Sequence, residues 1–154
     1  MKEFRVGIVG SRRRNSYNDQ KMILKIVTTL ISSNPSRAIV LVSGGCPKGA
    51  DSFAAVAARI HRVPIKEWLP EGGPFNSKWE FAKAAFARNE KIAADSTVGF
   101  AQVAADRTGG TENTVSHYLN MRKKIILIND SGNLYLPSGE SISYESACKD
   151  PDED

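Results

Sequence analysis

Apolar residues along this chain gather in short, nearly continuous runs, and each run is followed by a longer segment with helical spacing. The first run is "FRVGIVG" at 4–10, and the segment 17–33 after it carries an apolar stripe at steps of three and four residues. Near-continuous apolar runs are typical of strands that are buried on both faces of a sheet. The chain is therefore predicted to begin with a buried strand and an amphipathic helix.

The same alternation continues to about residue 130. Strands are predicted near 4–10, 38–43, 64–68, 96–101 and 124–128. Helices are predicted over 17–33, 50–62, 77–95 and 110–122. In the third helix, Ser77 is expected to be the N-cap, with Glu80 completing a capping box. Because strands alternate with helices, we expect an α/β protein with a Rossmann-like, doubly wound parallel sheet of five strands and helices on both faces.

Residues 131–154 show weaker patterning than residues 1–130. We therefore predict one domain over 1–130 and a C-terminal extension over 131–154. Tyr135, Leu136 and Tyr144 are expected to pack back on the core, whereas the acidic end, "DPDED", is expected to be disordered.

Charge and composition narrow the class of ligand. The chain has 154 residues and a net charge of +4, but the acidic end holds four acids, so the remainder carries 21 basic against 13 acidic residues. A basic body suits an anionic ligand. Cys46 and Cys148 have no partner motif, and neither a membrane-spanning run nor a signal-peptide pattern is present. We expect a cytoplasmic protein without a membrane partner.

Three glycine-containing turns follow predicted strands: "GSRRR" at 10–14, "SGGCPKGAD" at 43–51 and "DRTGGTENT" at 106–114. In a doubly wound sheet, ligands bind beyond the carboxyl ends of the strands. Glycine lets the backbone approach a ligand closely, and the amides at a helix N-terminus attract anions. The expected nucleotide-binding residues are Gly10, Ser11, Arg12, Ser43, Gly44, Gly45, Asp51, Gly109, Gly110 and Thr111.

A plainer interpretation exists for each of these turns. The three arginines at 12–14 would form a solvated loop, the glycines would be ordinary strand-to-helix turns, and Asp51 would cap the second helix. The second turn is not a Walker A loop, because no Lys-Ser/Thr pair follows its second glycine. His61 and His117 lie on separate predicted helices without ligand spacing, so we predict no metal site and no cofactor.

The turns together resemble the SLOG superfamily. The features that carry the resemblance are a strand ending in "GSR", a second ending in "SGG…GAD", a helix with "ARN" and a strand followed by "GGT", over roughly residues 4–128. That superfamily includes the DNA-processing protein A domain, the Lonely guy phosphoribohydrolases and small nucleotide-binding proteins, to which this chain is most similar. The resemblance implies a nucleotide or nucleotide-derived ligand and, with right-handed crossovers, the strand order 3-2-1-4-5.

The resemblance to the Lonely guy proteins also points to catalytic candidates. Their pattern P-G-G-x-G-T-x-x-E matches in part: Gly110 and Thr111 align with its glycine-threonine pair, but Thr114 stands at the glutamate position. The arginine of that family corresponds to Arg88 in "ARNEK". Glu112 and Asp106 are the nearby carboxylates that would replace the glutamate. The candidate catalytic residues are thus Arg88, Glu112 and Asp106.

Three functions remain open. The first is a module that binds a nucleotide or nucleotide-derived ligand, which Thr114 favours. The second is a nucleoside 5'-monophosphate phosphoribohydrolase, an enzyme that cleaves the N-glycosidic bond. The third is single-stranded DNA binding, for which no basic stripe with interleaved aromatics is present. Should the chain self-associate, we expect a homodimer.

The loop at 70–76 is flanked by four aromatic residues, whose default role is core packing and whose alternative role is to stack on a base. They are Trp68, Phe75, Trp79 and Phe81.

Overall fold

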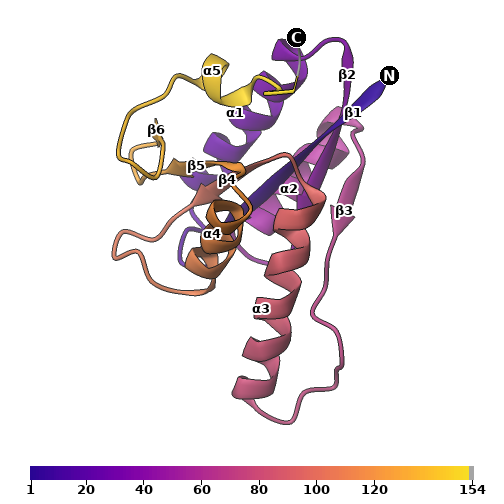
Figure 1. Cartoon of the computed structure of the whole chain (residues 1–154), viewed down its shortest axis with the longest axis vertical. Helices are drawn as coiled ribbons and strands as arrows, with labels where there is room; N and C mark the ends of the chain where they lie inside the picture. The colour runs from indigo at the N-terminus through magenta and orange to yellow at the C-terminus, as the bar shows by residue number, and fades with distance from the viewer. Residues whose placement is uncertain (153–154) are drawn as a thin grey trace.

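The computed structural model describes residues 1–152 and contains a six-stranded sheet with the order β3-β2-β1-β4-β5-β6 (Figure 1). The strands are β1 (Lys2–Gly10), β2 (Arg37–Ser43), β3 (Ile65–Glu67), β4 (Val98–Gln102), β5 (Lys124–Ile128) and β6 (Leu134–Tyr135). The first five are parallel, in the predicted order, which confirms the Rossmann-like fold. The prediction of five strands was incomplete, because β6 pairs antiparallel with β5.

Helices cover both faces of the sheet. They are α1 (Tyr17–Ser33), α2 (Ala50–His61), α3 (Lys78–Asp95), α4 (Gly110–Asn120) and α5 (Tyr144–Cys148). Alternate residues of β1 point to opposite faces: Ile8 belongs to the apolar cluster under α1 and α2, whereas Val9 belongs to the cluster under α3 and α4. Each face of the sheet therefore has its own core. No helix in the described residues is long and apolar enough to cross a membrane.

The segment after β5 folds against the rest of the chain. Leu136 and Tyr144 pack against the cluster under α1, as expected, and the Tyr144 hydroxyl donates to the carbonyl of Gly132 at 2.8 Å. Asp150 is buried and pairs with Arg37 at 2.9 Å, so the acidic segment begins inside the folded body. Residues 153–154 of that segment lie outside the described residues, so the disorder expected of them stays a prediction.

The five helices begin in two ways. The first residues of α1, α3 and α5 follow serine N-caps, Ser16, Ser77 and Ser143, and each serine hydroxyl accepts a backbone amide at 3.1 Å. By contrast, α2 and α4 follow Gly49 and Gly109, which have positive φ angles and no side chain to cap the helix.

The capping box predicted for α3 forms only in part. Ser77 is the N-cap, but the carboxylate of Glu80 accepts the amide of Asn76, one residue before the cap. A complete box forms instead at α1, where Ser16 and Asp19 satisfy each other's backbone amides.

The N-terminal half of α3 extends beyond the edge of the sheet (Figure 1). The buried residues of this helix are Asn89, Ile92 and Ala93, all in its C-terminal half. A loop over 68–77 connects β3 to the protruding end. The amphipathic pattern thus predicted the helix. It did not predict that only the C-terminal half of α3 packs against the sheet.

Candidate ligand pocket

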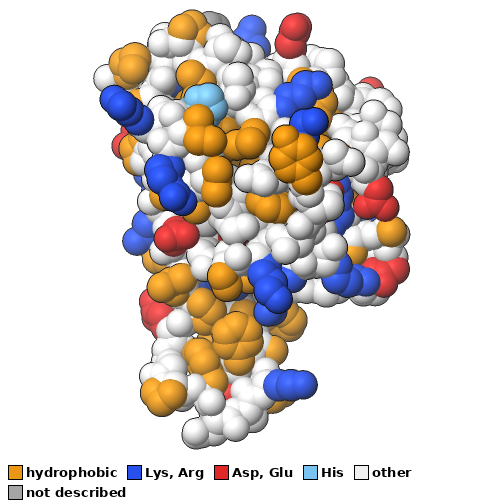
Figure 2. Space-filling view, turned by 180° about the vertical axis from the view of Figure 1, so that it is seen from behind, with side chains coloured by type: hydrophobic (Ala, Val, Ile, Leu, Met, Phe, Trp, Pro, Cys, Tyr) orange, Lys and Arg blue, Asp and Glu red, His pale blue; other side chains and the backbone are white. Residues whose placement is uncertain are grey.

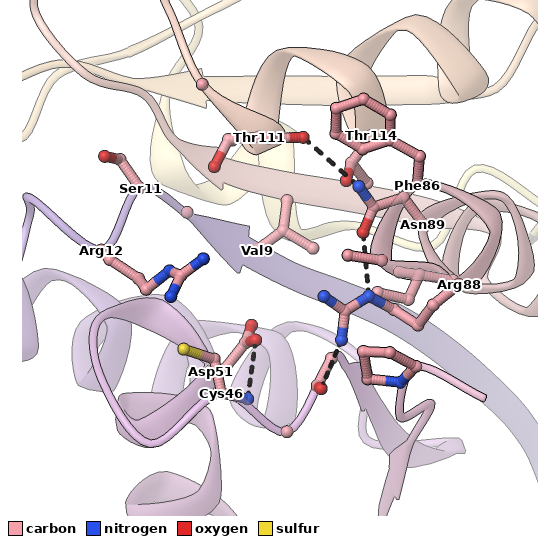
Figure 3. Close-up of a pocket in the computed structure, with 18 of the residues that line it drawn as sticks. Val9, Ser11, Arg12, Cys46, Asp51, Phe86, Arg88, Asn89, Thr111 and Thr114 are labelled. Atoms are coloured by element: carbon pink, nitrogen blue, oxygen red, sulfur yellow. Dashed lines mark hydrogen bonds between the residues drawn. The ribbon is translucent and has the colours of Figure 1, made fainter. Parts of the chain in front are cut away.

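A pocket of about 590 Å³ lies at the carboxyl ends of β1, β2 and β4, next to α3 (Figure 3). This is where a doubly wound sheet places its ligands, because the strand order changes direction between β1 and β4. All three glycine turns singled out in the sequence contribute to the lining. The opposite wall is apolar and includes Leu69, Pro70, Phe81 and Phe86.

The three consecutive arginines after β1 have three different environments. Arg14 is 4% exposed; it pairs with Asp19 at 2.9 Å and donates to backbone carbonyls at the ends of β4 and β5. Arg13 lies at the surface and forms two 2.8 Å hydrogen bonds with the carboxylate of Asp106. Arg12 is exposed, and its guanidinium points into the pocket (Figure 3). Arg12 and Arg13 both line the pocket, but Arg12 is the one of the three that forms no ion pair with a described residue.

In the turn after β2, Gly44 lies between the side chains of Asp51 and Arg88. A Cβ at Gly44 would lie 2.6 Å from Nη1 of Arg88 and 3.0 Å from Oδ2 of Asp51. The carboxylate of Asp51 accepts the amide of Cys46 at 3.0 Å. No larger residue than glycine fits between the two charged groups without moving one of them.

Burial raises the pKa of Asp51 to about 6. The amide of Cys46, the charge of Arg88 and the amide of Gly44 oppose this rise, because they stabilise the carboxylate. Among the described residues that line the pocket, Asp51 is the one acid. The pocket lining therefore contains one carboxyl group that titrates near neutral pH and three arginines, of which Arg13 is already paired with Asp106.

Arg88 forms the wall between β2 and α3. Its Nη1 donates to the carbonyls of Gly44 at 2.6 Å and Trp68 at 3.1 Å, and its Nε donates to the side chain of Asn89 at 3.0 Å. Burial lowers the pKa of Arg88, and the positive charge of Arg12 lowers it further. The other terminal nitrogen faces the pocket on the side of Arg12 (Figure 3). The guanidinium thus holds the turn in place and still presents a donor to the pocket.

The start of α4 supplies backbone amides to the same space. Gly110 and Thr111 follow the glycine N-cap and line the pocket. The side-chain amide of Asn89 donates to the carbonyl of Gly110 at 3.4 Å and to the side chain of Asn113 at 3.2 Å. These bonds fix the start of α4 against α3, so the positive end of the helix dipole is held at the pocket.

Nine of the ten predicted nucleotide-binding residues line the pocket; Ser43 does not. Ser43 is buried at the end of β2, where its hydroxyl accepts the amide of Gly45 at 3.3 Å. Asp51 does not cap α2, because the N-cap is Gly49.

Among the catalytic candidates, Arg88 lines the pocket, whereas Glu112 and Asp106 do not. Glu112 pairs with Arg107 at 2.7 Å. Asp106 pairs with Arg13, which holds the pKa of Asp106 well below its usual range. Thr114, at the position of the family glutamate, is buried in the pocket wall.

Sequence reasoning missed Phe86 and Asn89, although their spacing carried a signal. Ala82, Ala85, Asn89 and Ile92 recur at three- and four-residue steps and form the pocket side of α3, with Phe86 next to them. Of the four aromatic residues considered for stacking, Phe81 lines the pocket. Trp68 instead donates its indole N–H to Asp95 at 2.9 Å. No cluster of three or more potential metal ligands occurs in the part of the chain that the structure describes.

Comparisons with known proteins show the fold. No protein-family model matches the chain, and no curated protein matches it. The molybdenum cofactor binding protein from the phototrophic bacterium Rippkaea orientalis superposes with a TM-score of 0.65 at 22% identity, over 84% of this chain and 78% of that one. TM1055, a structural genomics target, superposes with a TM-score of 0.56 at 16% identity, over 83% and 74%. The chain thus shares a Rossmann-like α/β fold with a cofactor-binding protein.

Proposed function

We propose that this chain is a SLOG-type domain that binds a nucleotide or nucleotide-derived ligand in the pocket at the carboxyl edge of the sheet. The observation that carries the proposal is the pair of guanidinium groups, Arg12 and Arg88, which face the same space beside an uncapped helix start (Figure 3). A cofactor-binding protein with the same fold also supports a binding role.

A phosphate group accounts for the polar half of the pocket. The amides of Gly110 and Thr111, the dipole of α4 and the charge of Arg12 all favour an anion at one place. Arg13 does not compete for the anion, because Asp106 already neutralises it. The apolar wall containing Phe81 and Phe86 suits the planar base of a nucleotide.

Binding without cleavage is the function that the side chains support best. Both carboxylates considered as catalysts are paired with arginines, Glu112 with Arg107 and Asp106 with Arg13. An acid held in such a pair is less available to stabilise the positive charge that develops on a sugar as its glycosidic bond breaks.

One observation favours a second candidate function, cleavage of the N-glycosidic bond. Asp51 lines the pocket and has a pKa of about 6, so part of the population is protonated near neutral pH. A carboxylic acid of this kind can donate a proton to a departing base. In that role, Asp51 would replace the glutamate that Thr114 displaces.

The binding proposal is tested by mass spectrometry of small molecules released from the purified protein, followed by calorimetric titration with the nucleotide found or with AMP. Arg12→Ala should weaken binding roughly 10- to 150-fold, since one charge-assisted contact contributes about 1.5–3 kcal/mol. Arg13→Ala removes the same charge from the adjacent position and should leave affinity within about threefold, because an exposed ion pair contributes little. Equal losses in the two variants would contradict the proposal.

The two candidate functions separate in an incubation with nucleoside monophosphates. A binding module releases no free base, whereas a hydrolase does, and Asp51→Asn should abolish that release while largely preserving binding. Glu112→Gln and Asp106→Asn test the other carboxylates in the same assay. Displacement of bound nucleotide by oligothymidylate would favour the single-stranded DNA alternative.

A further inference from the structure

No side-chain contact within the described residues directs Arg12 into the pocket. Its guanidinium forms neither a hydrogen bond nor an ion pair with any of them, although it lines the pocket. Arg12 lies at a corner of the arginine turn, residues 11–14, which is closed by a 3.0 Å hydrogen bond from the amide of Arg14 to the carbonyl of Ser11. The direction of the Arg12 side chain therefore depends on what holds the backbone of this turn in place.

Arg14 is buried where the arginine turn meets the ends of two other strands. Figure 2 shows Lys and Arg side chains spread over the surface of one face of the molecule, whereas Arg14 is 4% exposed. Its Nη1 donates to the carbonyls of Val103 at 3.2 Å and Ile128 at 2.6 Å, and its Nη2 donates to the carbonyl of Asn129 at 3.0 Å. One guanidinium thus connects the arginine turn to the ends of β4 and β5.

Asp19 and Gln102 complete a closed ring of contacts around the arginine turn. Oδ1 of Asp19 accepts hydrogen bonds from Nε of Arg14 at 3.1 Å and from its Nη2 at 2.9 Å. The backbone carbonyl of Asp19 accepts the side-chain amide of Gln102 at 2.8 Å. The backbone carbonyl of Gln102 then accepts the amide of Ser11 at 2.9 Å, so the ring returns to the first residue of the turn.

Two features of this ring are unfavourable for stability. Gln102 is fully buried, and its Oε1 is the one buried side-chain atom in the described part of the chain that has no hydrogen-bond partner. An unpaired buried acceptor costs free energy, and a buried ion pair is often no more stabilising than apolar residues of the same volume. In some proteins such polar groups are retained because they hold the chain in one arrangement.

We propose that Arg14 is a positioning residue, which acts through Asp19 and Gln102 to hold the arginine turn so that Arg12 faces the bound anion. Arg14 does not line the pocket, and each of its three guanidinium nitrogens already donates within the chain. Lysine cannot replace it, because a single ammonium lacks the planar fork that reaches a carboxylate and several carbonyls together. This inference rests on the proposed function, in which Arg12 binds the anion.

Calorimetric titration with AMP tests this role in a double-mutant cycle. Arg14→Lys keeps the charge but loses the fork, and it should weaken AMP binding about 10-fold. In the Arg12→Ala background, the same change should weaken AMP binding by less than about twofold, because the turn then has no guanidinium to position. A merely structural role would instead weaken binding by the same factor in both backgrounds.

Arg37→Lys is the matched control. Arg37 also forms a largely buried ion pair, with Asp150 at 2.9 Å, but it lies at the start of β2, away from the pocket. This change should lower the melting temperature and leave AMP affinity within about twofold. Circular dichroism establishes that each variant is folded. If Arg14→Lys does not fold, Gln102→Met takes its place in the cycle, because it removes the bond to Asp19 together with the unpaired acceptor.

The outcomes separate this inference from the proposed function. Unchanged AMP affinity in Arg14→Lys, or equal losses in the two backgrounds, overturns the positioning role and leaves the binding proposal standing. A wild type that does not bind AMP, or an Arg12→Ala variant that binds it as tightly as wild type, overturns the role of Arg12 in the proposed function, and the positioning role fails with it.

Discussion

The helices with serine N-caps differ from the helices with glycine N-caps in what satisfies their first backbone amides. Ser16 and Ser77 cap α1 and α3 with their own hydroxyls, so the chain satisfies those helix starts by itself. Gly49 and Gly109 leave α2 and α4 without a side-chain cap, and the first turns of these two helices contribute residues to the pocket. A side chain at the start of a helix competes with a ligand for the same amides.

The difference has an energetic consequence. A serine N-cap stabilises a helix by roughly a few tenths of a kcal/mol more than a glycine N-cap does, so α2 and α4 lose little stability by lacking the side chain. An anion bound at α4 would supply the missing interaction and so raise the free energy of unfolding. Substitutions of Gly44, Asp51 and Ser16 test whether the glycine-capped helices serve binding while the serine-capped helices serve stability.

The largest effect on ligand affinity is expected from a substitution in the glycine turn after β2. Gly44→Ala places a methyl group 2.6 Å from Arg88 and 3.0 Å from Asp51, so one of the charged groups must move. We expect AMP affinity to fall at least about 100-fold and the free energy of unfolding to fall by about 1–3 kcal/mol.

Calorimetric titration and chemical denaturation measure these two effects. Gly73→Ala is the control, because a Cβ there comes no nearer than 3.4 Å to the side chain of Phe75 and Gly73 does not line the pocket. Unchanged affinity in Gly44→Ala would show that the turn does not shape the site.

An intermediate effect is expected from the acid in the first turn of α2. The pKa of Asp51 rises from 3.8 to about 6 on folding, so the native state holds more protons than the unfolded state between these values. The free energy of unfolding should therefore fall as pH rises through this window and level off above it, by up to about 3 kcal/mol.

Asp51→Asn should flatten that part of the pH profile, as urea denaturation at a series of pH values would show. Glu112→Gln, an acid of α4 outside the pocket lining, provides the comparison. A slope that survives in Asp51→Asn would assign the pH dependence to another group.

The smallest effect is expected at a serine-capped start. Ser16→Ala removes the hydroxyl that accepts the amide of Asp19 and should lower the free energy of unfolding by about 1 kcal/mol, seen as a lower melting temperature. Ser16→Asp retains an acceptor and should recover most of the loss. Nucleotide affinity should not change in either variant; a parallel loss of affinity would show that stability and binding are not separated in this way.

The sheet was predictable because its strands are short apolar runs whose crossovers must be right-handed. The order of β1 to β5 follows from that rule and the resemblance, whereas β6 was missed because two residues, Leu134 and Tyr135, give too short a pattern. The helices were also predictable from periodicity. How far α3 extends past the sheet edge depends on the length of the loop over 68–77 and on tertiary packing, which periodicity does not report.

The sequence predicted that the glycine turns form the pocket. It did not predict which acidic residues in these turns form ion pairs with arginines. Glu112 and Asp106 lie within the third glycine turn, yet each is paired with an arginine, because the loop after β4 folds back on itself and on the turn after β1. Asp51 was predicted to bind the nucleotide, with capping of α2 as the alternative, and only the folded chain brings it close to Arg88 around Gly44. The path of the backbone through the turns decides which acid pairs with which arginine. Residue types in the sequence say little about that path.

Arg12, Arg13 and Arg14 are the same residue type, but each has a different environment in the fold. One points into the pocket, the next pairs at the surface and the third is buried against two strand ends. An alignment of related sequences that slides by one position in this turn would match arginine with arginine and look equally good. It would nevertheless exchange the pocket-facing residue for the surface one, and the surface one for the buried residue. A one-residue insertion between Ser11 and Arg14 would therefore change all three environments while leaving the composition of the turn almost the same.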